Sequence, residues 1–148
     1  MAILIREVDG VDFQDLTIDI VRGSTFETKL FQYADTDDSG SDEPGDLTDY
    51  EFAIQVRTDP RSTTSLITIT NEYFFLGQSD DAIQYDIDEG NAPGTTKDEV
   101  YVSTPAELLQ VRPGNWYWDL KVTDPNDIVS FPIGGRFNIT QNVTRVGE

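Results

Sequence analysis

Apolar and polar residues alternate with a period of two in several segments of this chain. In the clearest segment the apolar positions are Trp116, Trp118, Leu120 and Val122. Successive side chains of a β-strand point to opposite faces, so this pattern predicts a strand with one face on a core and the other in water. The same alternation, strong or weak, occurs in seven further segments: 16–20, 26–30, 50–56, 67–69, 83–87, 129–133 and 137–139.

Turn-forming residues separate these segments and complete the fold prediction. Seven to nine short strands result, at roughly the 8–12-residue spacing that is typical of a β-sandwich. We therefore predict an all-β fold, a single antiparallel β-sandwich domain over residues 1–148. Gly134-Gly135 is either a tight turn or a bulge in one long final strand. The turns are expected at Arg22-Gly-Ser24, Asp59-Pro-Arg-Ser62, Pro113-Gly-Asn115 and Asp124-Pro-Asn-Asp127.

One short helix is expected near 104–110. Thr104 fits the N-cap position, Pro105 the first helical position and Glu107 the third position of a capping box. The helix would have two turns at most and would connect two strands.

The charge of the chain restricts its partners. Among 148 residues, 28 are acidic and 10 are basic, which gives a net charge of −18. Such a surface repels phosphate backbones and anionic lipid, so we expect neither a nucleic acid nor a membrane as partner. The first residues contain only a four-residue apolar run, so we expect no signal peptide and synthesis in the host cytoplasm.

The residue types available for catalysis are few. The chain has no His and no Cys, which excludes Ser-His and Cys-His catalysis and a Cys-type zinc site. Nucleotide-binding glycine motifs are absent as well. Asp86 and Asp88 would share one face of the strand expected from Ile83 onward. A hydrolase that uses these two carboxylates is therefore a third functional hypothesis, after the structural and binding roles considered below. We predict a non-enzymatic protein without a resident cofactor.

An acidic loop is expected over residues 35–49. Within it, oxygen-bearing side chains and Gly40 follow the approximate spacing of a calcium-binding loop. Asp stands at the last position, where the usual residue is Glu, and Pro44 lies inside the loop. The segment is therefore either a plain acidic hairpin loop or a calcium site, whose candidate ligands are Asp35, Asp37, Ser39 and Asp46.

Two aromatic groups allow two interpretations each. Trp116, Tyr117 and Trp118 could form a carbohydrate platform, but alternation places both tryptophans on one face, which favours a sandwich core. The run Tyr73, Phe74, Phe75 and Leu76 is either a buried strand or an exposed, adhesive sheet edge.

Several motifs, taken in order, have counterparts in a known group of proteins. The chain resembles small structural proteins of tailed bacteriophages, and is similar to the immunoglobulin-like N-terminal domain of phage baseplate upper proteins. The resemblance extends from about residue 16 to residue 145. The motifs are Arg22-Gly-Ser-Thr-Phe26, Asp46-Leu-Thr48 leading into Phe52–Arg57, Gly114-Asn-Trp-Tyr-Trp-Asp-Leu120, Gly134-Gly-Arg-Phe-Asn-Ile139 and Val143-Thr-Arg145.

The resemblance implies an immunoglobulin-like sandwich and a place in the virion. The expected role is an accessory or adaptor subunit of the tail, baseplate, neck or capsid exterior, present in many copies in a symmetric assembly. Its partners would be other virion proteins, and the resemblance implies no catalytic residues. The chain stops at Glu148 without the extension of longer adaptors, which favours a small accessory subunit.

Contacts with those partners are expected at three places. They are the N-terminal arm 1–10, the aromatic run, and the C-terminal tail 143–148. The alternative function is a carbohydrate- or receptor-binding sandwich, with or without calcium. The expected contact residues are Ile3, Leu4, Ile5, Arg6, Tyr73, Phe74, Phe75, Leu76, Val143 and Arg145.

Overall fold

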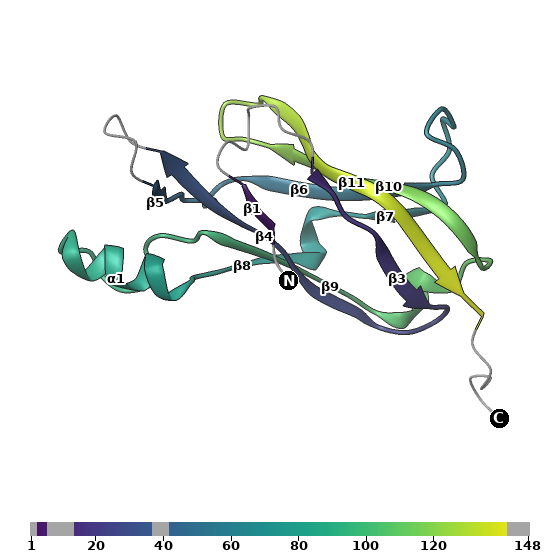
Figure 1. Ribbon diagram of the computed structural model, residues 1–148, viewed down its shortest axis with the longest axis horizontal. Coiled ribbons are helices and arrows are strands. Elements are labelled where there is room, and N and C mark those ends of the chain that lie inside the picture. Colours follow the sequence, from purple (N-terminus) through teal and green to yellow (C-terminus); the bar gives the residue numbers. More distant parts are fainter. Residues whose placement is uncertain (1–2, 6–13, 37–41, 142–148) are drawn as a thin grey trace.

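Two β-sheets pack face to face in the computed structural model of the chain, which describes residues 3–5, 14–36 and 42–141 (Figure 1). The predicted all-β sandwich is therefore confirmed. The five-stranded sheet has the order β1 (Ile3–Ile5), β4 (Phe26–Thr36), β9 (Glu99–Thr104) and β8 (Phe74–Gly77), with β5 (Asp42–Pro44) paired to the end of β4. The six-stranded sheet has the order β2 (Gln14–Asp15), β11 (Val129–Thr140), β10 (Gly114–Thr123), β6 (Glu51–Arg57) and β7 (Ile67–Ile69), with β3 (Ile18–Val21) also paired to β11.

Most strand pairs are antiparallel, and the parallel pairs lie at sheet edges. Strand β1 runs parallel to β4, and β2 and β3 run parallel to β11. Each of these strands has only two to four residues. The short N-terminal strands therefore extend both sheets at their margins, while the long antiparallel hairpin of β10 and β11 forms the centre of its sheet.

Aromatic side chains connect the two sheets through the core. The ring of Phe26 meets that of Phe137 edge to face at 6.1 Å, and Phe31 meets Phe52 in the same way at 6.3 Å. In each pair one ring comes from β4 and the other from the opposite sheet. Fully buried aliphatic residues fill the space around them: Leu30, Ile54, Val56, Ile69, Val100, Val102, Leu120, Val122 and Ile133.

The tryptophan strand confirms the predicted division of its side chains. Trp118 is buried, and its indole N–H donates a hydrogen bond of 2.8 Å to the carbonyl of Leu16. Trp116 is half-buried and packs against the core, with its N–H bonded to the carbonyl of Arg112. Tyr117 lies on the outer face. The tryptophans are therefore mainly core residues.

The glycine pair lies inside one long strand, β11. Gly135 has φ of +149°, and a Cβ at this position would lie 2.3 Å from Oδ1 of Asp15. The register irregularity falls between Leu120 and Val122 of the partner strand. On β11 near this point, Phe131 is 50% exposed whereas Ile133 is fully buried, so the two do not share one face as simple alternation would require.

The strand predicted at 83–87 was wrong, because this segment is helix α1 (Asp80–Asp88). The hydroxyl oxygen of Ser79 caps the helix by accepting a hydrogen bond from the N–H of Ala82, and two aspartates occupy the first turn, where carboxylates are favourable. Ile83 and Ile87 are four residues apart and lie on one exposed helical face. Their spacing therefore reflected helical periodicity.

The helix expected near 104–110 is a short 3-10 helix, η2 (Ala106–Leu109). Thr104 is not its cap, because this residue belongs to β9 and its hydroxyl donates to the carbonyl of Phe26. Leu109 anchors the turn in the core and is fully buried.

Truncation of one core side chain tests this packing. We expect Leu120→Ala to lower the free energy of unfolding by about 2–5 kcal/mol, because it leaves a cavity between the sheets. The exposed neighbour on the same strand provides the control, and Lys121→Ala should change stability by less than about 0.5 kcal/mol. Urea denaturation followed by tryptophan fluorescence measures both. Equal losses in the two variants would contradict the assigned faces of β10.

Candidate functional site

The aromatic run predicted as a contact surface lies at a sheet edge. Tyr73 ends the 3-10 helix η1 (Asn71–Tyr73), and the next three residues begin β8. Strand β8 is the last strand of the five-stranded sheet, and in the described part of the chain it pairs only with β9 (Figure 1). Of the two interpretations open from the sequence, the structure therefore supports an edge strand.

Alternate side chains of β8 point in opposite directions. Phe74 points inward, and its ring stacks on Phe52 with 5.7 Å between centroids. Tyr73 and Leu76 are partly buried and pack against the core. Phe75 points outward and is 46% exposed. Only one member of the run is therefore a prominent surface residue, while the other three hold the strand in place.

A row of three side chains crosses the outer face of this sheet. The register places Lys29 of β4 and Phe75 of β8 on either side of Tyr101 of β9. The rings of Phe75 and Tyr101 are nearly parallel, 7° apart in plane, with 5.1 Å between centroids. The stacked pair forms a flat aromatic surface beside β8, the last strand of this sheet among the described residues.

A buried carboxylate fixes the position of Tyr101. Glu99 accepts the tyrosine hydroxyl at 2.9 Å and the ammonium group of Lys29 at 2.7 Å. The bond to Glu99 raises the pKa of Lys29, and burial together with the same carboxylate raises the pKa of Tyr101. Both groups therefore keep their protons at neutral pH. Gly77 leaves room for the ring, since a Cβ there would lie 2.6 Å from it.

The strand signal for β9 is weak in the sequence. Its inward face carries only Val100 and Val102 between polar residues, although these do alternate with a period of two. The partners of Phe75, namely Tyr101, Glu99 and Lys29, were therefore not predicted. They come together only because strands far apart in sequence are neighbours in the sheet.

The other predicted contact residues have different positions. Ile3, Leu4 and Ile5 form β1, whose backbone pairs with residues 31–33 of β4. The N-terminal arm thus contributes a strand to its own sheet. Arg6, Val143 and Arg145 lie outside the described residues.

The predicted calcium ligands are only partly within the described chain. Asp35 lies in β4 opposite Glu43 of β5, whereas Asp37 and Ser39 lie outside the described residues. Oδ1 of Asp46 accepts hydrogen bonds from Thr48 and from the backbone N–H of Lys97, so it stabilises a turn. Within residues 3–5, 14–36 and 42–141, no three carboxylates form a group suited to a metal ion.

The expected pairing of Asp86 with Asp88 was wrong, because both residues belong to α1. Asp86 is fully buried, while Asp88 is exposed and accepts a hydrogen bond from Gln84. The Asp86 carboxylate accepts bonds from Gln78, from the backbone of Thr95, and from the backbone and hydroxyl of Thr96. These bonds, led by the Thr96 hydroxyl, lower the pKa of Asp86.

A second buried carboxylate supports the start of the same helix. Asp98 accepts the backbone N–H of Ser79 at 2.8 Å and also the Ser79 hydroxyl. Burial raises the pKa of Asp98 in spite of these bonds. Asp86 and Asp98 therefore fasten both ends of the segment between β8 and β9, and their role is structural.

Comparison of the sequence with protein-family models and with curated proteins gives no match. In the part of the chain that the structure describes, no helix is long and apolar enough to cross a membrane.

The Asp86 network predicts a pH-dependent stability. The pKa of Asp86 in the folded state lies below the ordinary value. The stability that the Asp86 carboxylate contributes is therefore present at neutral pH, and it is lost as the pH falls below about 4 toward the folded-state pKa. We expect Asp86→Asn to unfold more easily than the wild type at pH 7, with the difference narrowing as the pH falls below about 4. Denaturation curves at several pH values measure this. Asp88→Asn, on the exposed side of the helix, is the control and should change little; a constant difference for Asp86→Asn would contradict the assignment.

Proposed function

We propose that this protein is a non-enzymatic structural subunit of a tailed-bacteriophage particle, and that it joins other virion proteins through the edge strand β8. The observation that carries the proposed contact is the outward Phe75, stacked on Tyr101 beside an edge of β8 that no strand of the described residues pairs with. Many copies act together in a symmetric assembly.

An unpaired edge strand can accept an extended segment of another protein. Its free backbone N–H and C=O groups supply the hydrogen bonds, and its side chains supply specificity. Natural proteins usually protect such edges with charged residues, proline or bulges. The segment Tyr73–Gln78 contains neither charge nor proline. This composition supports an edge that is covered in the assembled state.

The contact that a single Phe75 side chain makes with a partner is weak, and a symmetric assembly compensates by repeating it. Complete burial of a phenylalanine side chain contributes about 1.5–3 kcal/mol. Such a contact alone does not hold two proteins together at low concentration. A ring or lattice that presents many copies multiplies it through avidity.

Charge indicates what kind of segment would bind. Glu72 precedes β8, and Asp80 and Asp81 follow it, all exposed. The chain as a whole carries a net charge of −18. A complementary partner segment would therefore be apolar in the middle, to cover Phe75, and basic at its ends.

The assignment to a phage particle rests on the motif resemblance, whose residues have structural roles. Residues 114–120 pair in register with residues 133–139, so two of the motifs form one hairpin. Gly23 occupies a turn with φ of +77°, and Leu47 is fully buried. The motif residues thus belong to the framework of the fold, while the proposed contact surface lies on β8, outside the motifs.

Loss of the exposed ring should prevent incorporation. We expect particles assembled in cells that supply Phe75→Ala to contain at least about tenfold fewer copies of the chain than particles made with wild type, because a large apolar contact is removed. Mass spectrometry of purified particles measures the copy number.

Phe131→Ala provides the matched control for this experiment. Phe131 is the same residue type with similar exposure, 50%, but it lies on β11 of the other sheet. Its variant should enter particles at the wild-type level. Equal incorporation of both variants would refute the role of β8, and particles that never contain the wild-type chain would refute the proposed function.

A further inference from the structure

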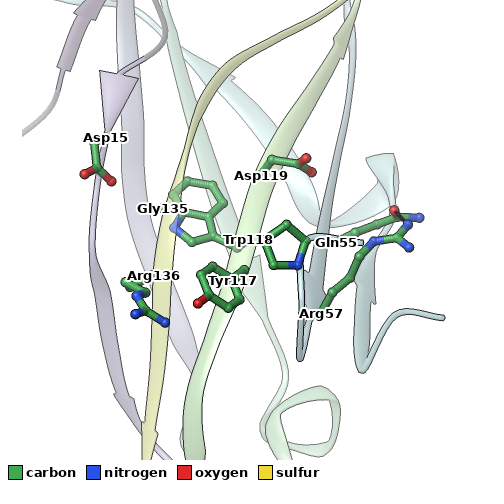
Figure 2. A pocket seen from close by; sticks show the side chains of 9 residues that line it. Asp15, Gln55, Arg57, Tyr117, Trp118, Asp119, Gly135 and Arg136 are labelled. Carbon is green, nitrogen blue, oxygen red and sulfur yellow. Dashed lines mark hydrogen bonds between the residues drawn. The ribbon is translucent and has the colours of Figure 1, made fainter. Parts of the chain in front are cut away.

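The outer face of the six-stranded sheet carries a hollow of about 440 Å³, which is within the usual size range of small-ligand sites. Tyr117 and Asp119 of β10 form its floor (Figure 2). Arg136 of β11 lies on one side, and Gln55 and Arg57 of β6 lie on the other. This hollow and Phe75 lie on different sheets, so an inference about the hollow does not depend on the proposed function.

The guanidinium group of Arg136 lies over one face of the Tyr117 ring. Tyr117 and Arg136 are direct neighbours in register, and the guanidinium carbon lies 4.4 Å from the centroid of the tyrosine ring. This cation–π contact holds Arg136 in place while its donors remain near the hollow. Pro60, from the loop after β6, adds a further apolar surface.

Arg57 on the opposite side is held by the protein itself. One terminal nitrogen donates to the carbonyl of Ser62 and the other to the side-chain oxygen of Gln55. A guanidinium group has five N–H donors, so further donors remain for a ligand. The group is therefore fixed in position and still able to bind.

Asp119 is a half-buried acceptor at the floor of the hollow. Burial raises its pKa, and the nearby charge of Arg57 opposes this shift. Its carboxylate accepts no hydrogen bond from any residue in the described part of the chain. A half-buried carboxylate has lost part of its hydration, and here no donor from the described residues replaces the lost water. The hydroxyl groups of a ligand would supply such donors.

The composition of the lining defines the class of ligand. The lining contains two arginines and two aspartates, Asp119 and Asp15, so its charges balance. The hollow therefore has no net charge that would favour a free anion or a free cation. The hollow instead combines an aromatic face with fixed donors and acceptors around it. A sugar ring needs this combination, because it has an apolar C–H face and hydroxyls at its edge.

We infer that this hollow binds one hexose ring of a glycan. The face of the Tyr117 ring that Arg136 does not cover stacks on the C–H face of the sugar. Asp119 accepts hydrogen bonds from the sugar hydroxyls, and Arg57 and Arg136 donate to hydroxyl oxygens. The site shares Tyr117 and Trp118 with the platform considered from the sequence, but Trp118 is mostly buried in the core, so Tyr117 is the aromatic side chain that a ligand would contact.

Titration of the isotopically labelled full chain with methyl glycosides of glucose, galactose, mannose and N-acetylglucosamine tests the inference by NMR. We expect at least one glycoside to shift amide signals around Tyr117, Asp119 and Arg136, with a dissociation constant on the order of millimolar. Tyr117→Ala removes the stacking ring and Asp119→Ala removes the charged acceptor, so each should weaken binding by about tenfold or more.

Two further variants separate binding from stability. Tyr117→Phe keeps the stacking face and should bind within about threefold of wild type, because only the hydroxyl is lost. Lys121→Ala, on the same strand but outside the hollow, should bind like wild type. No shift with any glycoside, shifts centred on another surface, or shifts with glycine betaine in place of sugars would overturn the inference.

Discussion

The contact on which the rest of this structure depends is the packing of Phe52 between Phe31 and Phe74. It joins β6 of one sheet to β4 and β8 of the other. Strand β8 has only four residues and, in the described part of the chain, pairs with β9 alone, so its position also depends on the inward packing of Phe74 and its neighbours Tyr73 and Leu76. Because side chains alternate along a strand, burial of Phe74 requires Phe75 to point outward. The core contact thus determines which surface is available to a partner.

The two outer faces of the sandwich have different chemistry. The five-stranded sheet presents a stacked aromatic pair that is fixed through Glu99 and Lys29. The six-stranded sheet presents a hollow in which charges of both signs surround Tyr117. The first suits an apolar segment of a protein, and the second suits a small hydroxylated ligand. The two proposals therefore concern opposite faces of one sandwich.

The parts of the fold that were predictable are those with long periodic signals. Three or more alternating apolar residues marked the strands that became β6 and β10, and burial of their inward faces kept that register. Helix α1 was not predictable in this way, because Ile83 and Ile87 fit both a period of two and a helical i, i+4 pair. The helix is stabilised by the cap at Ser79 and by the hydrogen bonds that Asp86 accepts from Thr96. The latter contact lies outside the helix itself.

Of the candidate site, only the aromatic run on β8 was predictable from the sequence. Phe75 belongs to an apolar run that is conspicuous in the sequence, whereas Tyr101 and Lys29 come from other strands, β9 and β4, and join it only through the sheet register. Imaging of intact particles by electron cryomicroscopy at side-chain resolution tests the central claim most directly. The account predicts an extended segment of another virion protein paired along β8 and covering Phe75. Particles in which this chain is present but β8 and Phe75 face solvent would contradict it.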